Sequence, residues 1–338
     1  MHYDPQERHI ELMRRAPRAL AYSEGEDFAA WQVRAREKLA QLLGLPLEMP
    51  ESDNFNIEWE QDGENFHEIR FTYASEPEVD VCCNLWLPKG ASGKIPVVIC
   101  LQGHSTGAHI SMGRPKYPGD EETISGGDRD FAKQIVARGQ AALVMEQRAF
   151  GERGGTENGP DCYQPAMAAL LLGRTLVGER CWDVMRGIDC LENHFADKID
   201  LGKIALQGQS GGGTVTCYAA ALDTRIAAAV PASAFCGYLE SIGAQKHCTC
   251  NYVPGIMKYF DMGDLAGMTA PRPLVIVGGA KDPIFPIDSA NREFAVAEKL
   301  YAAAGAPDKV RHVVGPEGHR FYAAQTWPVF DELTGWRG

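Results

Sequence analysis

A glycine-rich turn between an apolar run and an alanine-rich segment holds the serine best placed to do chemistry. The stretch KIALQGQSGGGTVTCYAAAL indicates a buried strand that runs through Gly208-x-Ser210-x-Gly212 into a helix. So sharp a turn strains the serine backbone, exposes its Oγ and leaves no room for side chains at the flanking glycines. The pattern predicts that Ser210 is a nucleophile. The Gly211 amide, at the helix N-terminus, would face the negative charge that develops when Oγ attacks a carbonyl.

Two other chemistries use glycine-rich turns of this kind. A Walker phosphate loop needs a lysine after the last glycine, but Thr214 and Val215 follow Gly213. A dinucleotide-binding turn needs glycine where Ser210 stands, and an acidic residue at the end of a following strand, which this sequence does not offer. An ordinary structural turn without chemistry is the remaining alternative.

The elements around this turn alternate between strands and helices. Short apolar runs, typical of strands buried on both faces of a parallel sheet, are IPVVICLQG, QAALVMEQ, KIALQG, IAAAVPAS and RPLVIVGGA. Between them lie the helical candidates DRDFAKQIVARG, WDVMRGIDCLENHF, GGTVTCYAAAL and SANREFAVAEKLYAAAG. KVRHVVGP supplies a last strand before a C-terminal helix. The alternation predicts a doubly wound α/β fold with a mostly parallel sheet and helices on both faces.

The N-terminal part of the chain has a different pattern. Residues 30–45 carry apolar residues at helical spacing, and Pro46 ends that helix. Residues 57–87 alternate apolar and polar residues, which predicts a pair of antiparallel strands. We expect residues 1–50 to form a helical segment packed on the core, and residues 51–338 to form a single α/β domain.

Three connections exceed ordinary loop length, and they are residues 103–128, 149–180 and 235–271. Each follows a predicted strand, so each should lie at the C-terminal edge of the sheet, where open α/β sheets bind their ligands. We expect these insertions to form the walls of a pocket.

From about Pro88 to its C-terminus the chain resembles the α/β-hydrolases. Within them it is similar to the acetyl xylan esterase and cephalosporin C deacetylase group and to dienelactone hydrolase-like proteins. The resemblance rests on the segments LQGH, EQRAFGERG, GQSGGG, KDPIFP and GHRFY. It implies the α/β-hydrolase fold and the hydrolysis of small acyl esters, such as those of acetylated sugars. No metal or organic cofactor is expected to take part.

The resemblance also implies the partners of Ser210. A serine nucleophile needs a histidine as base and a carboxylate that orients it. In α/β-hydrolases both follow the serine, the acid before the histidine, each just beyond a strand. Asp282 in GGAKDPIFP and His319 in GPEGHRFY match those positions. The backbone amide of His104 is the expected second oxyanion donor beside that of Gly211.

Other residues compete for these two roles. The competing carboxylates lie in the long insertion or at a predicted helix start: Asp261, Asp264 and Asp288. Among the other histidines only His312 follows the predicted acid, and it lies inside an apolar strand. Arg148 lies in the segment EQRAFGERG, and we expect it to form an ion pair with a helix acid such as Asp183.

The insertion 235–271 supplies further pocket candidates. We predict substrate contacts from the insertion and from the neighbour of the serine, namely Gln209, Cys236, Tyr238 and His247. His247, Cys248 and Cys250 are residue types that suit zinc, but a zinc site usually has a second pair of ligands at a distance. We therefore expect no metal.

Composition narrows the partners. The 33 Lys and Arg against 45 Asp and Glu give a net charge of −12, which argues against binding to nucleic acid or to anionic membranes. The absence of a signal peptide and of roughly 18 consecutive apolar residues predicts a soluble, cytoplasmic protein. Ten cysteines in 338 residues are too sparse for a disulfide scaffold, so we expect reduced thiols. A small-molecule ester is the expected partner, and the sequence leaves the oligomeric state open.

Three functions compete. An esterase acting through an acyl-enzyme fits all the motifs. A serine peptidase of the prolyl oligopeptidase kind shares this catalytic domain, but such enzymes usually carry a large N-terminal propeller and only about ninety residues precede the core here. A non-catalytic binding protein with the same fold is the third alternative. We predict the esterase.

Overall fold

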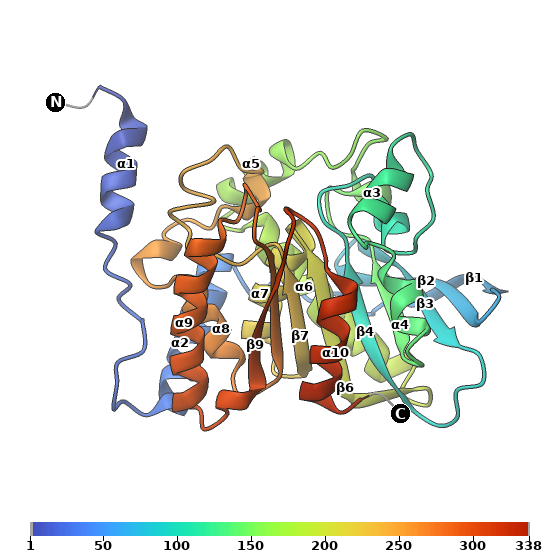
Figure 1. Cartoon of the computed structure of the whole chain (residues 1–338). Coiled ribbons are helices and arrows are strands. Elements are labelled where there is room, and N and C mark those ends of the chain that lie inside the picture. The colour runs from blue at the N-terminus through green and yellow to red at the C-terminus, as the bar shows by residue number, and fades with distance from the viewer. Residues whose placement is uncertain (1–2, 337–338) are drawn as a thin grey trace.

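The computed structural model describes residues 3–336 and builds them around one nine-stranded sheet (Figure 1). The strand order is β1-β2-β3-β5-β4-β6-β7-β8-β9. The strands are β1 (Asn56–Asp62), β2 (Phe66–Glu76), β3 (Val79–Pro88), β4 (Ile95–Leu101), β5 (Ala141–Met145), β6 (Ile199–Gln209), β7 (Ile226–Ala232), β8 (Leu274–Gly279) and β9 (Val310–Gly315).

The sheet is antiparallel at one end and parallel over the rest. Strands β1, β2, β3 and β5 pair antiparallel, whereas β4 pairs in parallel with β5 and β6, and β6 to β9 continue in parallel. This confirms the predicted fold class. The predicted antiparallel pair is instead a set of three strands, because β1 was missed. Strand β1 is exposed along its whole length, Ile57 and Trp59 included, so this strand has no buried face.

Helices cover both faces of the sheet (Figure 1). One face packs against α2, α6, α7, α8 and α9, and the other against α4 and α10. The helices are α1 (Pro5–Arg14), α2 (Phe28–Leu43), α3 (Asp120–Gly126), α4 (Phe131–Val136), α5 (Tyr163–Leu171), α6 (Leu176–His194), α7 (Gly211–Leu222), α8 (Met262–Thr269), α9 (Ile287–Ala303) and α10 (Ala323–Thr334).

The two N-terminal helices differ in how they meet the core. The Asp27 side chain caps α2 by accepting a hydrogen bond from the Ala30 amide at 2.9 Å, and Gly44 ends the helix in a left-handed conformation. Trp31 and Leu39 of α2 are buried in the core. Helix α1 buries none of its residues and stands beside the body of the molecule (Figure 1). The division of the chain at residue 50 stays a prediction.

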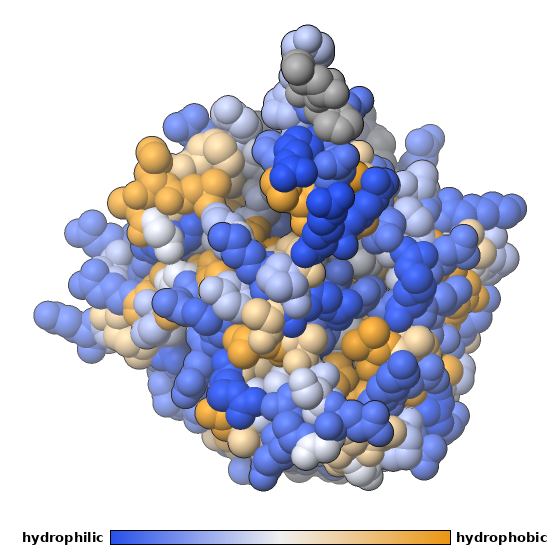
Figure 2. All heavy atoms as spheres, turned by 90° about the vertical axis from the view of Figure 1, so that its left-hand side faces the viewer, coloured by the Kyte–Doolittle hydropathy of each residue, from blue (hydrophilic) through white to orange (hydrophobic). Residues whose placement is uncertain are grey.

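The molecular face beside α1 is predominantly hydrophilic, with hydrophobic residues in small separate groups (Figure 2). Within residues 3–336, no helix combines the length and the apolar character that crossing a bilayer requires.

The three long connections leave the carboxyl edge of the parallel strands, after β4, β5 and β7. They contain α3, α5 and α8, and Figure 1 shows α3 and α5 above that edge. The same edge carries the turns that end β6, β8 and β9. Residues from six separate parts of the chain therefore meet there, as open α/β sheets require of a ligand site.

Candidate active site

Ser210 occupies the sharp turn between β6 and α7. Its φ of 54° and ψ of −118° lie in a region that side-chain-bearing residues rarely adopt. The Ser210 amide donates to the Ala232 carbonyl of β7 at 2.8 Å, which holds the turn against the neighbouring strand. This is the strained strand-to-helix backbone that the glycine pattern predicts.

The glycines that flank Ser210 are required by close backbone contacts. A Cβ atom on Gly208 would lie 2.3 Å from the Gly212 carbonyl oxygen, and one on Gly212 would lie 2.2 Å from the Leu101 carbonyl oxygen. Strand β4 and the first turn of α7 thus pack directly on the turn. No side chain fits at either position.

Asp282 and His319 form a hydrogen-bonded pair beyond the ends of β8 and β9. His319 Nδ1 lies 2.9 Å from Asp282 Oδ2, while Asp282 Oδ1 accepts the amides of Ile284 at 2.8 Å and Phe285 at 3.1 Å. Burial of the Asp282 carboxyl acts to raise its pKa, but the His319 hydrogen bond and the two amides hold the pKa below its ordinary value. Asp282 is therefore a carboxylate at neutral pH and an acceptor for the imidazole N–H.

One cavity of about 300 Å³ brings Ser210 and His319 together. The rest of its lining comes from the first and third insertions, from the residue that follows the first, and from the β8 turn: His104, Arg129, Gln245, Lys246, His247, Cys248 and Ile284. The insertion 149–180, also expected to form a pocket wall, contributes no lining residue to this cavity. Asp282 lies behind the histidine with 5% of its surface exposed. A substrate in this cavity would meet the serine and the imidazole, and the carboxylate would act through the imidazole.

The residues whose amides are predicted to bind an oxyanion, His104 and Gly211, lie close to each other. The position of a Cβ on Gly211 would be 2.8 Å from the His104 ring, so the loop after β4 rests on the first residue of α7. Within residues 3–336, the amides of His104 and Gly211 donate to no protein acceptor. Both are free to donate to a ligand.

A buried glutamate holds the loop that carries His104. Glu146, at the end of β5, accepts a hydrogen bond from Gln102 Nε2 at 2.5 Å and another from the Ala108 amide at 2.9 Å. These two bonds anchor the loop on both sides of His104. Burial is the main cause that raises the pKa of Glu146 to about 7, against the hydrogen bonds that act to lower it.

Three of the four predicted substrate contacts lie outside the cavity. Gln209 is completely buried beneath Gly103, Cys236 is buried in a small apolar cluster, and Tyr238 is buried with its hydroxyl 2.6 Å from that of Tyr218. Gln209 was predicted as the neighbour of the serine, and Cys236 and Tyr238 as members of the insertion 235–271, but all three side chains are buried away from the cavity. His247 does line the cavity, and burial lowers its pKa to about 4.

Two cations of the cavity were missed in the sequence. Arg129, directly after the first insertion, and Lys246, in the third, both line the cavity, and neither pairs with a carboxylate in the described part of the chain. Burial lowers the pKa of Arg129. The cavity is therefore locally positive although the chain carries a net charge of −12. No sequence pattern marks these residues, because charged side chains are common in insertions.

The competing carboxylates have other partners. Asp261 and Asp264 form a capping box at the start of α8, and Asp264 pairs with Arg18 at 2.9 Å. Asp288 lies in the first turn of α9. The predicted structural ion pair is confirmed, because Arg148 Nη2 lies 2.7 Å from Asp183 Oδ1.

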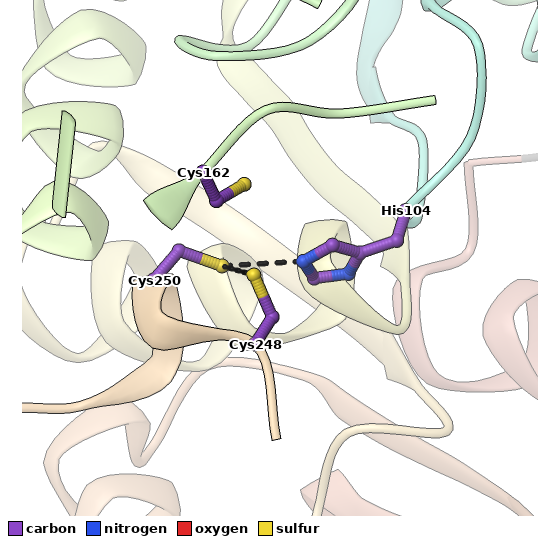
Figure 3. A group of neighbouring side chains, drawn as sticks. All are labelled: His104, Cys162, Cys248 and Cys250. Carbon is purple, nitrogen blue, oxygen red and sulfur yellow. Dashed lines mark hydrogen bonds between the residues drawn. The ribbon is translucent and has the colours of Figure 1, made fainter. Parts of the chain in front are cut away.

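A group of potential metal ligands lies beside the cavity. His104, Cys162, Cys248 and Cys250 place one ligand atom each within 4.8 Å of all the others (Figure 3). The expectation of no metal depended on a missing second ligand pair. That reasoning needs correction, since folding brings His104 and Cys162 to the two cysteines of the insertion. Hydrogen bonds from Cys162 and Cys250 lower the pKa of the Cys248 thiol to about 3.

Comparison with known proteins agrees with this architecture. The model of the Abhydrolase family matches residues 14–326, and the chain belongs to that family. Over 239 residues it is 27% identical to "Putative hydrolase YtaP" of Bacillus subtilis, which covers 69% of this chain and 75% of that protein. The predicted resemblance to α/β-hydrolases is thereby confirmed.

Two solved structures extend the likeness in fold. A protein of Bacteroides fragilis described as a "putative acetyl xylan esterase" superposes with a TM-score of 0.79 at 19% identity, over 93% of this chain and 83% of that one. A glucuronoyl esterase from Solibacter usitatus superposes with a TM-score of 0.70 at 16% identity, over 94% of this chain and 97% of that one. The α/β-hydrolase fold therefore spans nearly the whole chain.

Proposed function

We propose that this protein is a serine hydrolase that cleaves small carboxylic esters through an acyl-enzyme intermediate. The observation that carries the proposal is the Asp282–His319 pair, joined at 2.9 Å, whose histidine lines the same cavity as the strained Ser210. Family membership supports a hydrolase, and the strained serine supports nucleophilic catalysis.

In the proposed reaction Ser210 Oγ attacks the ester carbonyl while His319 takes the hydroxyl proton. Asp282 accepts a hydrogen bond from the Nδ1–H of the imidazole, stays a carboxylate and stabilises the imidazolium that forms. The amides of His104 and Gly211 bind the oxyanion, and the loss of one such donor would cost about 3 to 4 kcal/mol in the transition state. His319 then protonates the leaving alcohol. In the second half of the reaction His319 takes a proton from water, the resulting hydroxide attacks the acyl-enzyme, and Ser210 leaves with the proton from His319 as the carboxylic acid is released.

Acylated sugars are the substrate class that we propose. The resemblance to acetyl xylan esterases and the fold shared with carbohydrate esterases point to sugars. A cavity of about 300 Å³ holds a short acyl group more readily than a long one. Arg129 and Lys246 favour substrates that offer carboxylate or several oxygen acceptors near the ester. The net charge of −12 argues against large polyanionic partners, but these two cations give the cavity itself a local positive charge.

The proposal is tested with Ser210→Ala. The variant should lose p-nitrophenyl acetate hydrolysis by at least about 10⁴-fold, and should no longer be labelled by a fluorophosphonate probe, because both reactions need Oγ. Circular dichroism should show an unchanged fold. Retained hydrolysis in a folded variant would refute the serine mechanism, and cleavage of proline-containing peptide amides in preference to esters would favour a peptidase.

A panel of esters then separates substrates. Acyl length is varied from acetyl to octanoyl on sugar and on aryl alcohols, and kcat/KM is compared. A preference for short acyl groups on sugars would support deacetylation, and a preference for aryl esters of long acids would contradict it.

A further inference from the structure

The four potential ligands come from the three insertions at the carboxyl edge of the sheet. His104 belongs to residues 103–128, Cys162 to residues 149–180, and both Cys248 and Cys250 to residues 235–271. In Figure 3 all four side chains converge on one point between the loops. His104 Nε2 lies 3.2 Å from Cys250 Sγ, and the two sulfurs of Cys250 and Cys248 lie 3.3 Å apart. No two of these insertions are neighbours in sequence, so tertiary folding alone assembles the group.

We propose that these side chains form a closed structural site for one divalent cation that prefers thiolate and imidazole ligands, with zinc as its occupant. Three cysteines and one histidine make a common ligand set for structural zinc, with bonds of about 2.3 Å to sulfur and about 2.0 Å to nitrogen. Tetrahedral bonds of that length separate neighbouring ligand atoms by about 3.5 to 3.8 Å. The observed 3.2 and 3.3 Å contacts need only a small outward rotation of the side chains.

The charge of the surroundings fits a cluster of thiolates. Arg180 is buried, with 2% of its surface exposed, and its Nη2 lies 3.3 Å from Cys162 Sγ. Within residues 3–336 it forms no ion pair with a carboxylate, and its other contacts include the Cys250 thiol, the Arg148 carbonyl and the Phe150 ring. A buried cation without a partner is costly. Zinc with three thiolates carries one net negative charge, and the guanidinium of Arg180 neutralises it.

Occupation of the site would displace the thiol protons that remain. The metal binds thiolates, so each protonated cysteine of the three releases one proton to solvent as its sulfur–metal bond forms, and neither sulfur nor metal changes oxidation state. All four positions around the cation are then taken by protein. The site therefore has no open position for substrate and its role is structural.

The bound metal would affect the cavity through its ligand His104. The imidazole Nε2 faces Cys250, and the opposite edge of the ring rests on Gly211. A cation bound at Nε2 would clamp the ring, and so hold the backbone amide of His104 at a fixed place beside the serine turn. This second consequence rests on the proposed esterase function, whereas metal binding itself does not.

The first experiment measures metal in the full-length protein. Wild type grown with added zinc and purified without chelator should carry about one zinc per chain by elemental mass spectrometry, because there is one site. Cys162→Ser and Cys250→Ser should each lose most of it. Cys190→Ser, which removes a buried thiol of α6 outside the group, should keep it. A folded Cys250→Ser that retains full zinc would overturn the proposal.

A second measurement protects the test against variants that fail to fold. Wild type is stripped with a chelator and titrated with Co²⁺, and one equivalent should produce thiolate-to-cobalt charge-transfer absorption with tetrahedral visible bands. Absence of this absorption, together with absence of zinc, refutes the site. A Cys248–Cys250 disulfide in the freshly purified protein, detected by thiol titration under native conditions, would also refute it if the reduced protein still binds no Co²⁺.

Turnover separates the two parts of the inference. Cys162 does not line the cavity, so Cys162→Ser can act on turnover only through the displaced His104 loop. We expect this variant to lower kcat for p-nitrophenyl acetate while KM changes little. Zinc loss with unchanged kcat would refute the positioning role and leave the metal site standing. Zinc binding by a wild type that hydrolyses no ester would refute the proposed function instead.

Discussion

Replacement of Asp282 by asparagine tests the arrangement of the acid and the base most directly. The two amides of Ile284 and Phe285 donate to Oδ1, so the asparagine must keep its carbonyl oxygen there and point its NH₂ group at His319. An NH₂ group cannot accept a hydrogen bond from Nδ1–H. The imidazole must then accept at Nδ1 and carry its proton on Nε2, the nitrogen that the mechanism needs as a base.

The expected loss in kcat is about 10⁴-fold, equivalent to about 5.5 kcal/mol in the transition state, because the wrong tautomer dominates. Stability should change far less, by about 1 to 3 kcal/mol, since one charge-assisted hydrogen bond is weakened while the two amide bonds remain. The assay is the steady-state kinetics of p-nitrophenyl acetate hydrolysis beside thermal unfolding.

Asp288→Asn is the matched control, because Asp288 is the competing carboxylate nearest in sequence and lies in the first turn of α9. It should leave kcat within about twofold. If Asp282→Asn retains kcat within tenfold of wild type, or if Asp288→Asn is the damaging change, the assignment of the acid is wrong.

Two further substitutions address the loop that carries His104. Gly211→Ala puts a methyl group 2.8 Å from the His104 ring, so the ring and its loop must shift, and we expect kcat to fall about 10² to 10³-fold and the unfolding temperature to fall as well. An unaltered kcat would contradict the contact. The pKa of Glu146 is about 7 in the folded protein and about 4.5 in the unfolded chain. Because the folded state holds this proton more tightly, the free energy of unfolding should fall by about 3 kcal/mol as pH rises from 4.5 through 7. Glu146→Gln should remove this slope from denaturant unfolding measured between pH 5 and 8, and an unchanged slope would assign the effect elsewhere.

The parts of the site that the sequence predicts share one property, which is dependence on neighbours in the chain. The Gly208-x-Ser210-x-Gly212 turn follows from contacts between adjacent elements. The positions of Asp282 and His319 follow from the ends of β8 and β9, which apolar runs mark clearly. Strand β1 escaped because its alternation is short, with only Ile57 and Trp59 as apolar residues, and all of its residues are exposed.

Side-chain direction within the insertions could not be predicted. Tyr238 and Cys236 belong to the right insertion but point into the core, whereas Arg129 and Lys246, which no pattern singles out, line the cavity. Insertions lack a period of 2 or 3.6 residues that would assign faces, so only packing against the rest of the fold decides which side chains reach the cavity.

By itself, then, the sequence determined the α/β class and predicted the strained turn at Ser210, because both depend on short-range spacing and burial. The proposed acid and base came from the resemblance to α/β-hydrolases. Tertiary structure alone decided the positive charge of the cavity and the meeting of His104 and Cys162 with Cys248 and Cys250. Up to 146 residues separate those ligands along the chain. Contacts at that distance exist only after strands β4, β5 and β7 have aligned their carboxyl ends at one edge of the sheet.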